Sequence, residues 1–197
     1  SYPSSPYTVN HEGKGPAWAN SLFEDNAEFG YGMYLAVKHI RAKIAENMES
    51  LLAMDICDEA REAFTAWLDA KEDGEASKVA SAKVVAVLAN AHNIENAEVK
   101  ALVEEIKERE DYLVKRSQWI LGGDGWAYDI GYGGVDHVLA SGENVNVLVF
   151  DTEIYSNTGG QSSKSTPVAA MAKFAAAGKR TRKKDLGMMA MSYGNVY

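Results

Sequence analysis

Apolar residues in the middle of the chain recur with the spacing of α-helices. Between Met33 and Leu51 the apolar positions step by three and four residues, which predicts a helix that runs to about residue 52. The same spacing predicts three further helices, near residues 55–72, 77–91 and 96–114. This middle block is charged and carries no chemical motif, so we interpret residues 53–114, approximately, as a helical insertion.

Two short apolar runs further along the chain predict buried strands. They lie at residues 117–121 and 146–150, and a predicted helix at about 127–141 separates them. Strands that alternate with helices are typical of parallel sheets. We therefore predict an α/β fold, in which an open, mainly parallel sheet is flanked by helices and carries the helical insertion.

Local signals predict where other elements begin and end. Ser21 and Glu24 have the spacing of a capping box, which predicts that the first helix begins at Ser21. Residues 168–177 are predicted to be helical, with Gly178 as the stop signal. Asp185 is predicted to begin the last helix.

Candidate chemistry follows each predicted strand. Asp124 lies in a Gly-Asp-Gly turn after the first strand, and Thr152 follows the second. One helical crossover would place Asp124 beside Thr152, at the strand ends where α/β sheets bind ligands. A carboxylate and a hydroxyl next to glycine backbone suit a hard divalent cation that carries a phosphate. The alternative is an ordinary turn, with the Thr152 hydroxyl capping the residues that follow.

Three longer stretches carry a family resemblance. They read GPAWANSLFEDNAEFG at residues 15–30, GDGWAYDIGYGGVDHVLASG at 123–142 and DTEIYSNTGGQSSK at 151–164. These stretches resemble the thiamine-diphosphate-binding region of pyruvate:ferredoxin (flavodoxin) oxidoreductases. The resemblance is strong at residues 6–35 and 117–197 and weak in the helical middle. It implies the thiamine-diphosphate-binding fold, with residues 1–197 forming part of that domain in a larger chain.

The resemblance also implies how the cofactor would be held. Mg²⁺ would take a carboxylate oxygen from Asp124, the hydroxyl of Thr152 and the backbone carbonyl of Ile154. Two diphosphate oxygens and a water would complete six ligands. Trp126 and Phe23 would border the thiazolium ring. The alternatives are a core position for Trp126 and a packing contact at the helix start for Phe23.

The polar loop after Thr152 supplies the candidate catalytic residue. By resemblance, Asn157 would donate a hydrogen bond to the 2-oxo acid or to the reaction intermediate, and an Asn in a plain turn is the alternative. Further contacts with the cofactor are implied for Asn157 itself and for Gly123, Gly125 and Thr158.

Composition narrows the classes of partner. The 197 residues carry a net charge of −8, which disfavours nucleic acid, and no apolar run approaches the length of a membrane span. The single cysteine, Cys57, excludes a disulfide framework and a complete zinc or iron–sulfur ligand set, and we expect it to be buried. No signal-peptide pattern is present, so we expect a cytoplasmic setting. The basic run at 180–184 is interpreted as solvated surface, with a docking patch for ferredoxin or coenzyme A phosphates as the alternative.

The resemblance implies an activity for the parent enzyme. The chain would be the cofactor-binding portion of an enzyme that oxidatively decarboxylates pyruvate to acetyl-CoA and CO₂. Electrons would pass through [4Fe-4S] clusters, which this segment does not ligate, to ferredoxin or flavodoxin. Coenzyme A, the remaining domains of the parent chain and a second copy in a homodimer are the other expected partners.

The ends of the sequence suggest a piece of a longer polypeptide. No initiator Met is present, and the last residues, 195–197, read as the start of another strand. In the family, the Glu that activates the aminopyrimidine lies on a separate domain. We therefore expect this chain to be inactive alone.

Three alternative functions remain open. The chain can belong to a related 2-oxo acid:ferredoxin oxidoreductase, or be a non-catalytic scaffold fragment that keeps the fold and binds no cofactor. A nucleotide-binding α/β domain is disfavoured, because no Gly-x-Gly-x-x-Gly turn follows the first strand.

Overall fold

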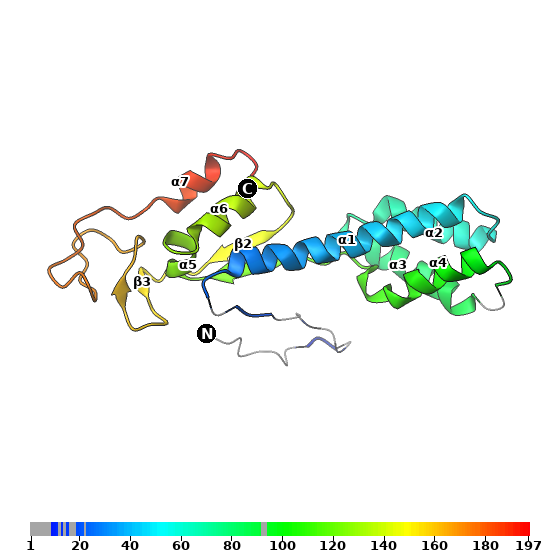
Figure 1. Cartoon of the computed structure of the whole chain (residues 1–197), viewed down its shortest axis with the longest axis horizontal. Coiled ribbons are helices and arrows are strands. Elements are labelled where there is room, and N and C mark those ends of the chain that lie inside the picture. Colours follow the sequence, from blue (N-terminus) through cyan, green and yellow to red (C-terminus); the bar gives the residue numbers. More distant parts are fainter. Residues whose placement is uncertain (1–8, 12, 14, 16–18, 22, 92–93) are drawn as a thin grey trace. The chain divides into compact units, whose positions relative to one another are not determined.

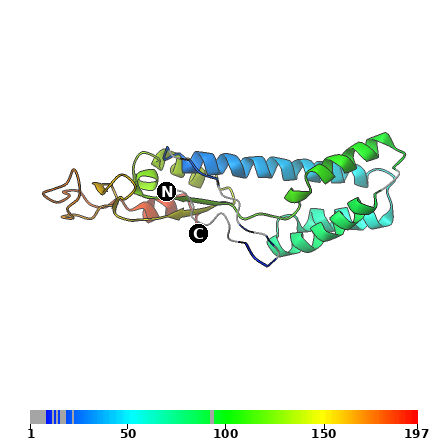
Figure 2. The ribbon, with the colours of Figure 1, turned by 90° about the horizontal axis from the view of Figure 1, so that it is seen from below.

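The chain divides into two compact units, each described here by itself. The computed structural model (Figure 1) describes residues 9–11, 13, 15, 19–21, 23–91 and 94–197. The first unit contains the described residues up to Gly32 together with Gln118–Tyr197, and the second contains Met33–Ser117. Helix α1 (Asn26–Leu52) contributes residues to both units, and Figure 2 shows it as one uninterrupted helix.

The first unit contains the parallel strand pair that the sequence predicts. Strand β1 (Trp119–Gly122) pairs in parallel with β2 (Asn146–Val149). Two short helices, α5 (Asp124–Tyr128) and α6 (Tyr132–Ala140), form the crossover in place of the single helix predicted there. The parallel pair, its helical crossover and the helical middle of the chain confirm the predicted α/β class with a helical insertion.

The polar region after β2 contains a small hairpin and a last helix. Strands β3 (Ile154–Tyr155) and β4 (Gln161–Ser162) pair antiparallel. Helix α7 (Leu186–Met191) begins where predicted, because the Asp185 carboxylate caps it by accepting a hydrogen bond from the Met188 N–H over 3.0 Å.

The apolar face of the crossover packs on the β1–β2 pair. Val135 and Val138 of α6 pack with Ile120 of β1 and with the fully buried Trp126 of α5. Figure 1 shows α6 running alongside β2. The partly buried residues of this core are Tyr31, Leu139, Val145, Val147, Val149 and Leu186. This burial fixes the ends of β1 and β2, where the candidate site residues lie.

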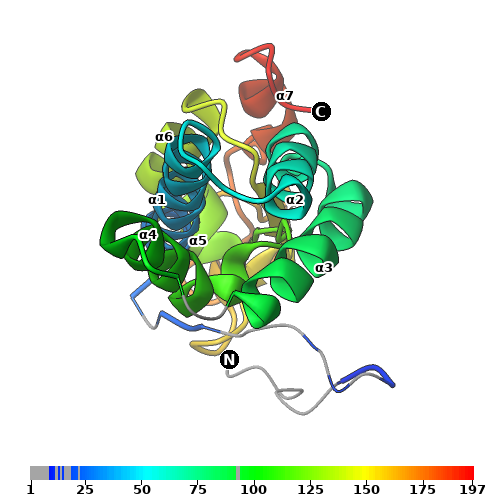
Figure 3. The same cartoon turned by 90° about the vertical axis from the view of Figure 1, so that its right-hand side faces the viewer.

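The second unit is a helical bundle. It contains the rest of α1 with α2 (Asp58–Ala70), α3 (Gly74–Asn90) and α4 (Ala97–Glu108), followed by the 3₁₀ turn Glu110–Tyr112. Figure 3 views these helices nearly end-on. The fully buried side chains of its core include Ile44, Met48, Leu51, Phe64, Trp67, Val84, Leu88, Ile106 and Leu113. The four helices predicted from apolar spacing are therefore confirmed. None of the helices in the described part of the chain combines the length and apolar character needed to cross a bilayer.

The predicted start of the first helix at Ser21 is wrong. Helix α1 begins at Asn26, and its first turn is marked by the Phe29 N–H donating to the Asp25 carbonyl over 3.0 Å. Glu24 has a φ of 58°, in the left-handed region that a right-handed helix excludes. Leu22, within the predicted capping box, and residues 16–18 of the first motif stretch lie outside the described residues.

The predicted helix at 168–177 is also wrong. The Lys173 N–H donates to the Gly160 carbonyl over 3.0 Å, and the Ser162 N–H donates to the Lys173 carbonyl over 2.9 Å. Phe174 has a left-handed φ of 67°. The segment therefore bonds to the hairpin around β4 instead of forming helical bonds within itself.

Cys57 is exposed, so its predicted burial is wrong. It occupies the N-cap position of α2, with extended backbone, directly before Asp58. A cap residue precedes the first helical turn, and Cys57 consequently lies off the apolar face that α2 presents to the bundle.

Candidate functional site

Asp124 and Thr152 lie next to each other beyond the ends of β1 and β2. The Thr152 backbone N–H donates a hydrogen bond to Asp124 Oδ1 over 2.9 Å, and the Thr152 hydroxyl oxygen lies 3.4 Å from the same atom. Parallel pairing brings the carboxyl ends of the two strands to one edge of the sheet. The strand–helix–strand pattern predicted this adjacency, and the structure confirms it.

The backbone carbonyl of Ile154 extends this pair to a row of three oxygens. The Thr152 hydroxyl donates to the Ile154 carbonyl over 3.0 Å. Glu153, between them, has a left-handed φ of 65°, which is uncommon for a residue other than glycine. Neighbouring ligands of an octahedral Mg²⁺ ion lie about 3 Å apart, because each ligand lies about 2.1 Å from the metal. The separations of 3.4 Å and 3.0 Å along the row fit this spacing.

The donor set is composed of oxygen atoms with a single carboxylate. Among the described residues, no three His, Cys, Asp or Glu side chains gather into a group that could hold a metal ion. A cation bound at this row would therefore be ligated by a carboxylate, a hydroxyl and a carbonyl. Such ligands suit Mg²⁺ better than zinc, which prefers nitrogen and sulfur.

The second carboxylate oxygen of Asp124 accepts hydrogen bonds from two serines. Ser163 Oγ donates to Asp124 Oδ2 over 3.0 Å, and Ser165 Oγ donates to the same oxygen. Asp124, Ser163 and Ser165 are only 3%, 5% and 0% exposed. The sequence analysis did not single out either serine, because hydroxyl residues are common in polar loops and have no periodic signature.

The two aromatic residues expected beside the thiazolium ring differ in their surroundings. Trp126 is fully buried in the core of the first unit, and its indole N–H has no hydrogen-bond partner among the described residues. Phe23 is 83% exposed. Trp126 thus fills a core position, and the contact of either residue with a cofactor stays a prediction.

Asn157 and Thr158 lie in the exposed turn between β3 and β4. The Asn157 amide Nδ2 donates to Glu24 Oε1 over 3.4 Å. The Thr158 hydroxyl donates to the side-chain oxygen of Gln161 over 2.6 Å. Asn157 keeps a second amide N–H that can serve a ligand, because the Asn amide carries two donors.

Glu24 is a residue of this region that the sequence analysis assigned to a helix cap instead. A Cβ atom on Gly125 would lie 3.2 Å from Glu24 Oε1, and one on Gly131 would lie 2.4 Å from the Glu24 carbonyl oxygen. The Glu24 side chain therefore approaches Gly125 of the Gly-Asp-Gly turn, and the Glu24 backbone approaches Gly131, where glycine permits the close contact. The glycines after Asp124 were the signal that another segment packs there.

A carboxylate, a phenol and an ammonium group meet beside the end of β2. Asp151 Oδ2 accepts hydrogen bonds from Lys183 Nζ over 2.6 Å and from the Tyr128 hydroxyl over 2.7 Å. Burial opposes ionisation of Asp151, but these hydrogen bonds outweigh it and lower the pKa of its carboxyl group. Burial, reinforced by Asp151, raises the pKa of Tyr128, and the bond to Asp151 raises the pKa of Lys183.

Two members of the basic run at 180–184 contact the protein itself, so solvated surface describes only part of the run. Lys183 bonds to the carboxylate described above. Lys184 Nζ lies 3.1 Å from the centroid of the Tyr132 ring and donates to the Tyr128 carbonyl over 3.2 Å. These contacts hold the segment before α7 against α5 and α6.

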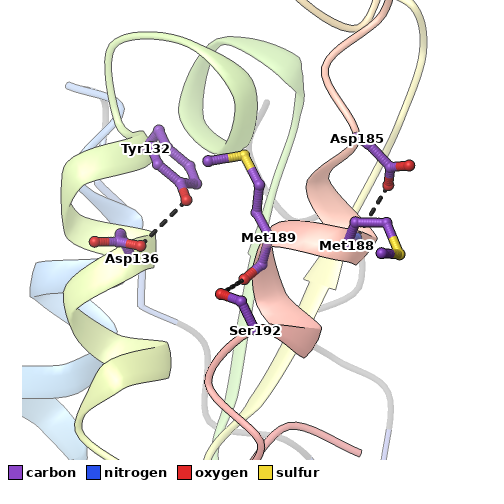
Figure 4. Close-up of a pocket in the computed structure, with 6 residues that line it drawn as sticks. All are labelled: Tyr132, Asp136, Asp185, Met188, Met189 and Ser192. Carbon is purple, nitrogen blue, oxygen red and sulfur yellow. Dashed lines mark hydrogen bonds between the residues drawn. The ribbon is translucent and has the colours of Figure 1, made fainter.

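A separate shallow hollow lies between α6 and α7 (Figure 4). Its lining residues are Tyr132, Asp136, Asp185, Met188, Met189 and Ser192. The Tyr132 hydroxyl donates to Asp136 Oδ1 over 3.1 Å across this surface. None of the predicted site residues lines the hollow, so the candidate site remains the row of oxygens beyond β1 and β2.

Comparison with known proteins identifies similar sequences along the whole chain. The pyruvate-flavodoxin oxidoreductase of Klebsiella pneumoniae is 62% identical over 197 residues, which are all of this chain and 16% of the relative. The pyruvate:ferredoxin oxidoreductase of Moorella thermoacetica is 57% identical over the whole chain and 17% of its own length. The pyruvate-flavodoxin oxidoreductase of Enterobacter agglomerans is 56% identical, again over the whole chain and 17% of the relative. No family model matches the chain.

The chain spans about one sixth of the length of these curated relatives. The sequence identity is above 50% along the whole length of the chain. This is much higher than the identity between unrelated proteins that share an α/β fold. The whole chain therefore corresponds to one segment of the pyruvate-flavodoxin and pyruvate:ferredoxin oxidoreductases, the enzyme family that its motifs resemble.

Proposed function

We propose that this chain is the part of a pyruvate:ferredoxin (flavodoxin) oxidoreductase that holds thiamine diphosphate through Mg²⁺. The observation that carries the proposal is the row of Asp124 Oδ1, Thr152 Oγ1 and the Ile154 carbonyl at consecutive separations of 3.4 Å and 3.0 Å. The names of the relatives support oxidation of pyruvate with transfer of electrons to flavodoxin or ferredoxin.

In this proposal each residue has a role in binding or orientation. Asp124, Thr152 and Ile154 hold Mg²⁺, and the backbone at Gly123 and Gly125 lets the diphosphate approach. Thiamine diphosphate held there would supply a carbon nucleophile and an electron sink for the decarboxylation of a 2-oxo acid.

Asn157 is the proposed contact with the substrate. One N–H of its amide is directed to Glu24, and the other is available to a 2-oxo acid oxygen. Phe23, Trp126 and Thr158 are proposed to line the cofactor. The [4Fe-4S] clusters, coenzyme A, the homodimer and the cytoplasmic setting belong to the parent enzyme in the same proposal.

The metal row distinguishes this proposal from a scaffold fragment that has lost its cofactor. A scaffold has no requirement for the Asp124 carboxylate beyond folding, whereas a magnesium site loses its only carboxylate ligand in Asp124→Ala. Calorimetric titration with thiamine diphosphate and Mg²⁺ tests this difference. We expect saturable binding to the unaltered chain that requires Mg²⁺ and that falls at least about tenfold in Asp124→Ala.

The matched control is Asp69→Ala, which removes an exposed carboxylate from α2 in the helical unit. This variant should bind as the unaltered chain does. Equal binding by Asp124→Ala, or no binding by the unaltered chain with Mg²⁺ present, would contradict the proposal. If the proposal holds, comparing pyruvate with other 2-oxo acids as substrates of the parent enzyme would identify the substrate.

A further inference from the structure

Two buried serines restrain the carboxylate of Asp124. Ser163 Oγ lies 3.0 Å from Asp124 Oδ2, Ser165 Oγ donates to the same oxygen, and the two hydroxyl oxygens lie 2.7 Å apart. Both serines come from the loop after β4, about forty residues along the chain from Asp124. Because all three side chains are at most 5% exposed, water cannot replace these bonds.

The protons available in this triangle allow both serines to donate to Asp124 Oδ2. The two serine hydroxyls make three contacts: one from each serine to Asp124 Oδ2, and one between the two serines. Each hydroxyl has one proton, so both protons can be donated to Oδ2 only if neither serine donates to the other. The Ser165 N–H also donates to Ser163 Oγ over 3.0 Å, which leaves the Ser163 proton free to point at the carboxylate. Oδ2 is thereby saturated by two donors, and Oδ1 remains on the side of Thr152.

The serine loop is itself held in place. Lys179 Nζ donates to the Ser163 and Thr166 carbonyls, each over 2.7 Å. The Thr166 hydroxyl accepts from the Ser163 N–H over 2.9 Å and donates to the Glu153 carbonyl. The same loop therefore contacts Asp124 and also Glu153, the residue between Thr152 and Ile154.

We propose that Ser163 and Ser165 are positioning residues that restrict Asp124 to coordination through one oxygen, and that they thereby select Mg²⁺ over Ca²⁺. Mg²⁺ requires six ligands in near-ideal octahedral geometry, which a carboxylate bound through both oxygens distorts. Ca²⁺ accepts six to eight ligands at longer distances, including carboxylates bound through both oxygens. This inference rests on the proposed function, because it concerns the same metal row.

The test is the metal selectivity of the double variant Ser163→Ala/Ser165→Ala. Its carboxylate has a free Oδ2, which can turn toward the ion. Dissociation constants for Mg²⁺ and for Ca²⁺ are measured by calorimetry on the full chain with saturating thiamine diphosphate. Removing a residue that orients a metal ligand typically costs about 10–100-fold in metal affinity. Because Mg²⁺ depends more on this orientation than Ca²⁺ does, we expect the ratio of Mg²⁺ to Ca²⁺ affinity to fall at least about tenfold.

A matched double variant, Ser141→Ala/Ser192→Ala, removes two exposed serines whose hydroxyls bond to helix carbonyls in the same unit. It should keep the ratio of the unaltered chain. The single variant Ser163→Ala removes the less buried of the two donors. It replaces the double variant in the same measurement if the double variant does not fold. Its ratio should shift in the same direction by a smaller factor.

The outcomes separate this inference from the function on which it rests. An unchanged ratio, or an equal loss of both metals, would overturn the selectivity role while the unaltered chain still binds Mg²⁺ and thiamine diphosphate. An unaltered chain that binds neither would overturn the proposed function and this inference with it.

Discussion

Gly122 and Gly123 are neighbours, but a side chain would meet different surroundings at the two positions. A Cβ atom on Gly122 would lie 2.2 Å from Cε3 of Trp126, whose ring is fully buried and has no room to move away. A Cβ atom on Gly123 would approach only the Phe150 carbonyl oxygen, at 3.9 Å. The fold therefore requires glycine at 122 and leaves space at 123, where the proposal places the diphosphate.

This contrast predicts effects of different size for two adjacent substitutions. Gly122→Ala should lower the free energy of unfolding by about 1–3 kcal/mol or more, because it overpacks the core. Gly123→Ala should change it by less than about 1 kcal/mol, since the new methyl group is accommodated and the unfolded chain loses freedom. Urea unfolding followed by circular dichroism measures both. If Gly123 faces the diphosphate, Gly123→Ala also weakens thiamine diphosphate binding. Equal destabilisation by the two variants would contradict the packing argument.

The position of a candidate site residue could be predicted from the sequence only where the strand topology determines that position. Asp124 and Thr152 each follow a strand, so parallel pairing was enough to bring them together. Ser163 and Ser165 reach Asp124 through an irregular loop, and no spacing rule connects positions so far apart. Glu24 was assigned to a helix cap because local sequence favours that motif, whereas its backbone has a left-handed φ and packs closely on Gly131.

At the scale of single elements, the alanine-rich segment 168–177 shows how tertiary contacts override local propensity. Its residues favour helix, but a helix of this length is marginal without an apolar face to bury. In the structure the Ala169 N–H donates to the Lys179 carbonyl over 2.8 Å, and the Lys179 N–H donates to the Ala170 carbonyl over 3.0 Å. The segment therefore pairs with neighbouring backbone and holds the lysine that supports the serine loop.

The helices of the middle block were predicted well for the opposite reason. Ala60, Phe64 and Trp67 of α2 share one helical face, and all three are buried as their spacing requires. Here the periodic pattern and the tertiary contacts agree, so the sequence is a sufficient guide.

The end of β2 is tied to the segment before α7 by Asp151 and Lys183, and this link predicts a pH dependence. The pKa of Asp151 is lowered from 3.8, so the ion pair stabilises the folded state above about pH 4, and this contribution is lost as pH falls through the lowered value. The pKa of Lys183 is raised from 10.5, so its contribution is present below that pH and is lost as pH rises through the raised value.

Asp151→Asn should therefore lower the free energy of unfolding at pH 7 by about 1 kcal/mol or less, because both side chains are about one third exposed. The difference from the unaltered chain should shrink toward zero near pH 3. Urea unfolding at pH 7, 5 and 3 measures it, with Asp69→Asn on an exposed face of α2 as the control. A difference that stayed constant down to pH 3 would rule out the ion pair as its source.

At the scale of the whole molecule, the described residues form two separate hydrophobic cores. One contains Ile120, Trp126 and Val138, and the other contains Trp67 and Ile106 with their neighbours. The end of the second unit at Ser117 coincides with a change of composition, where the charged helical block gives way to glycine-rich motifs. The candidate metal row and the serine loop both belong to the first unit.

Because each unit has its own core, we predict that the two units can unfold independently of each other. The same substitution, Ile to Ala, can be made in each core to test this. Ile106 of α4 is fully buried in the helical bundle, and Ile120 of β1 is 2% exposed in the strand-containing unit. Replacing either with Ala should cost about 2–5 kcal/mol in its own core. Amide hydrogen exchange followed by mass spectrometry reports which helices and strands then open more often.

We expect Ile106→Ala to speed exchange in α2, α3 and α4 while β1, β2 and α6 keep their protection. Ile120→Ala should do the reverse and should weaken Mg²⁺-dependent binding of thiamine diphosphate, because Asp124 lies two residues beyond the end of β1. Helix α1 spans both units, so its residues after Gly32 should follow the Ile106 variant. Faster exchange throughout the chain in either variant would show that the two cores unfold as one cooperative unit, and the helical bundle would then contribute directly to the stability of the cofactor site.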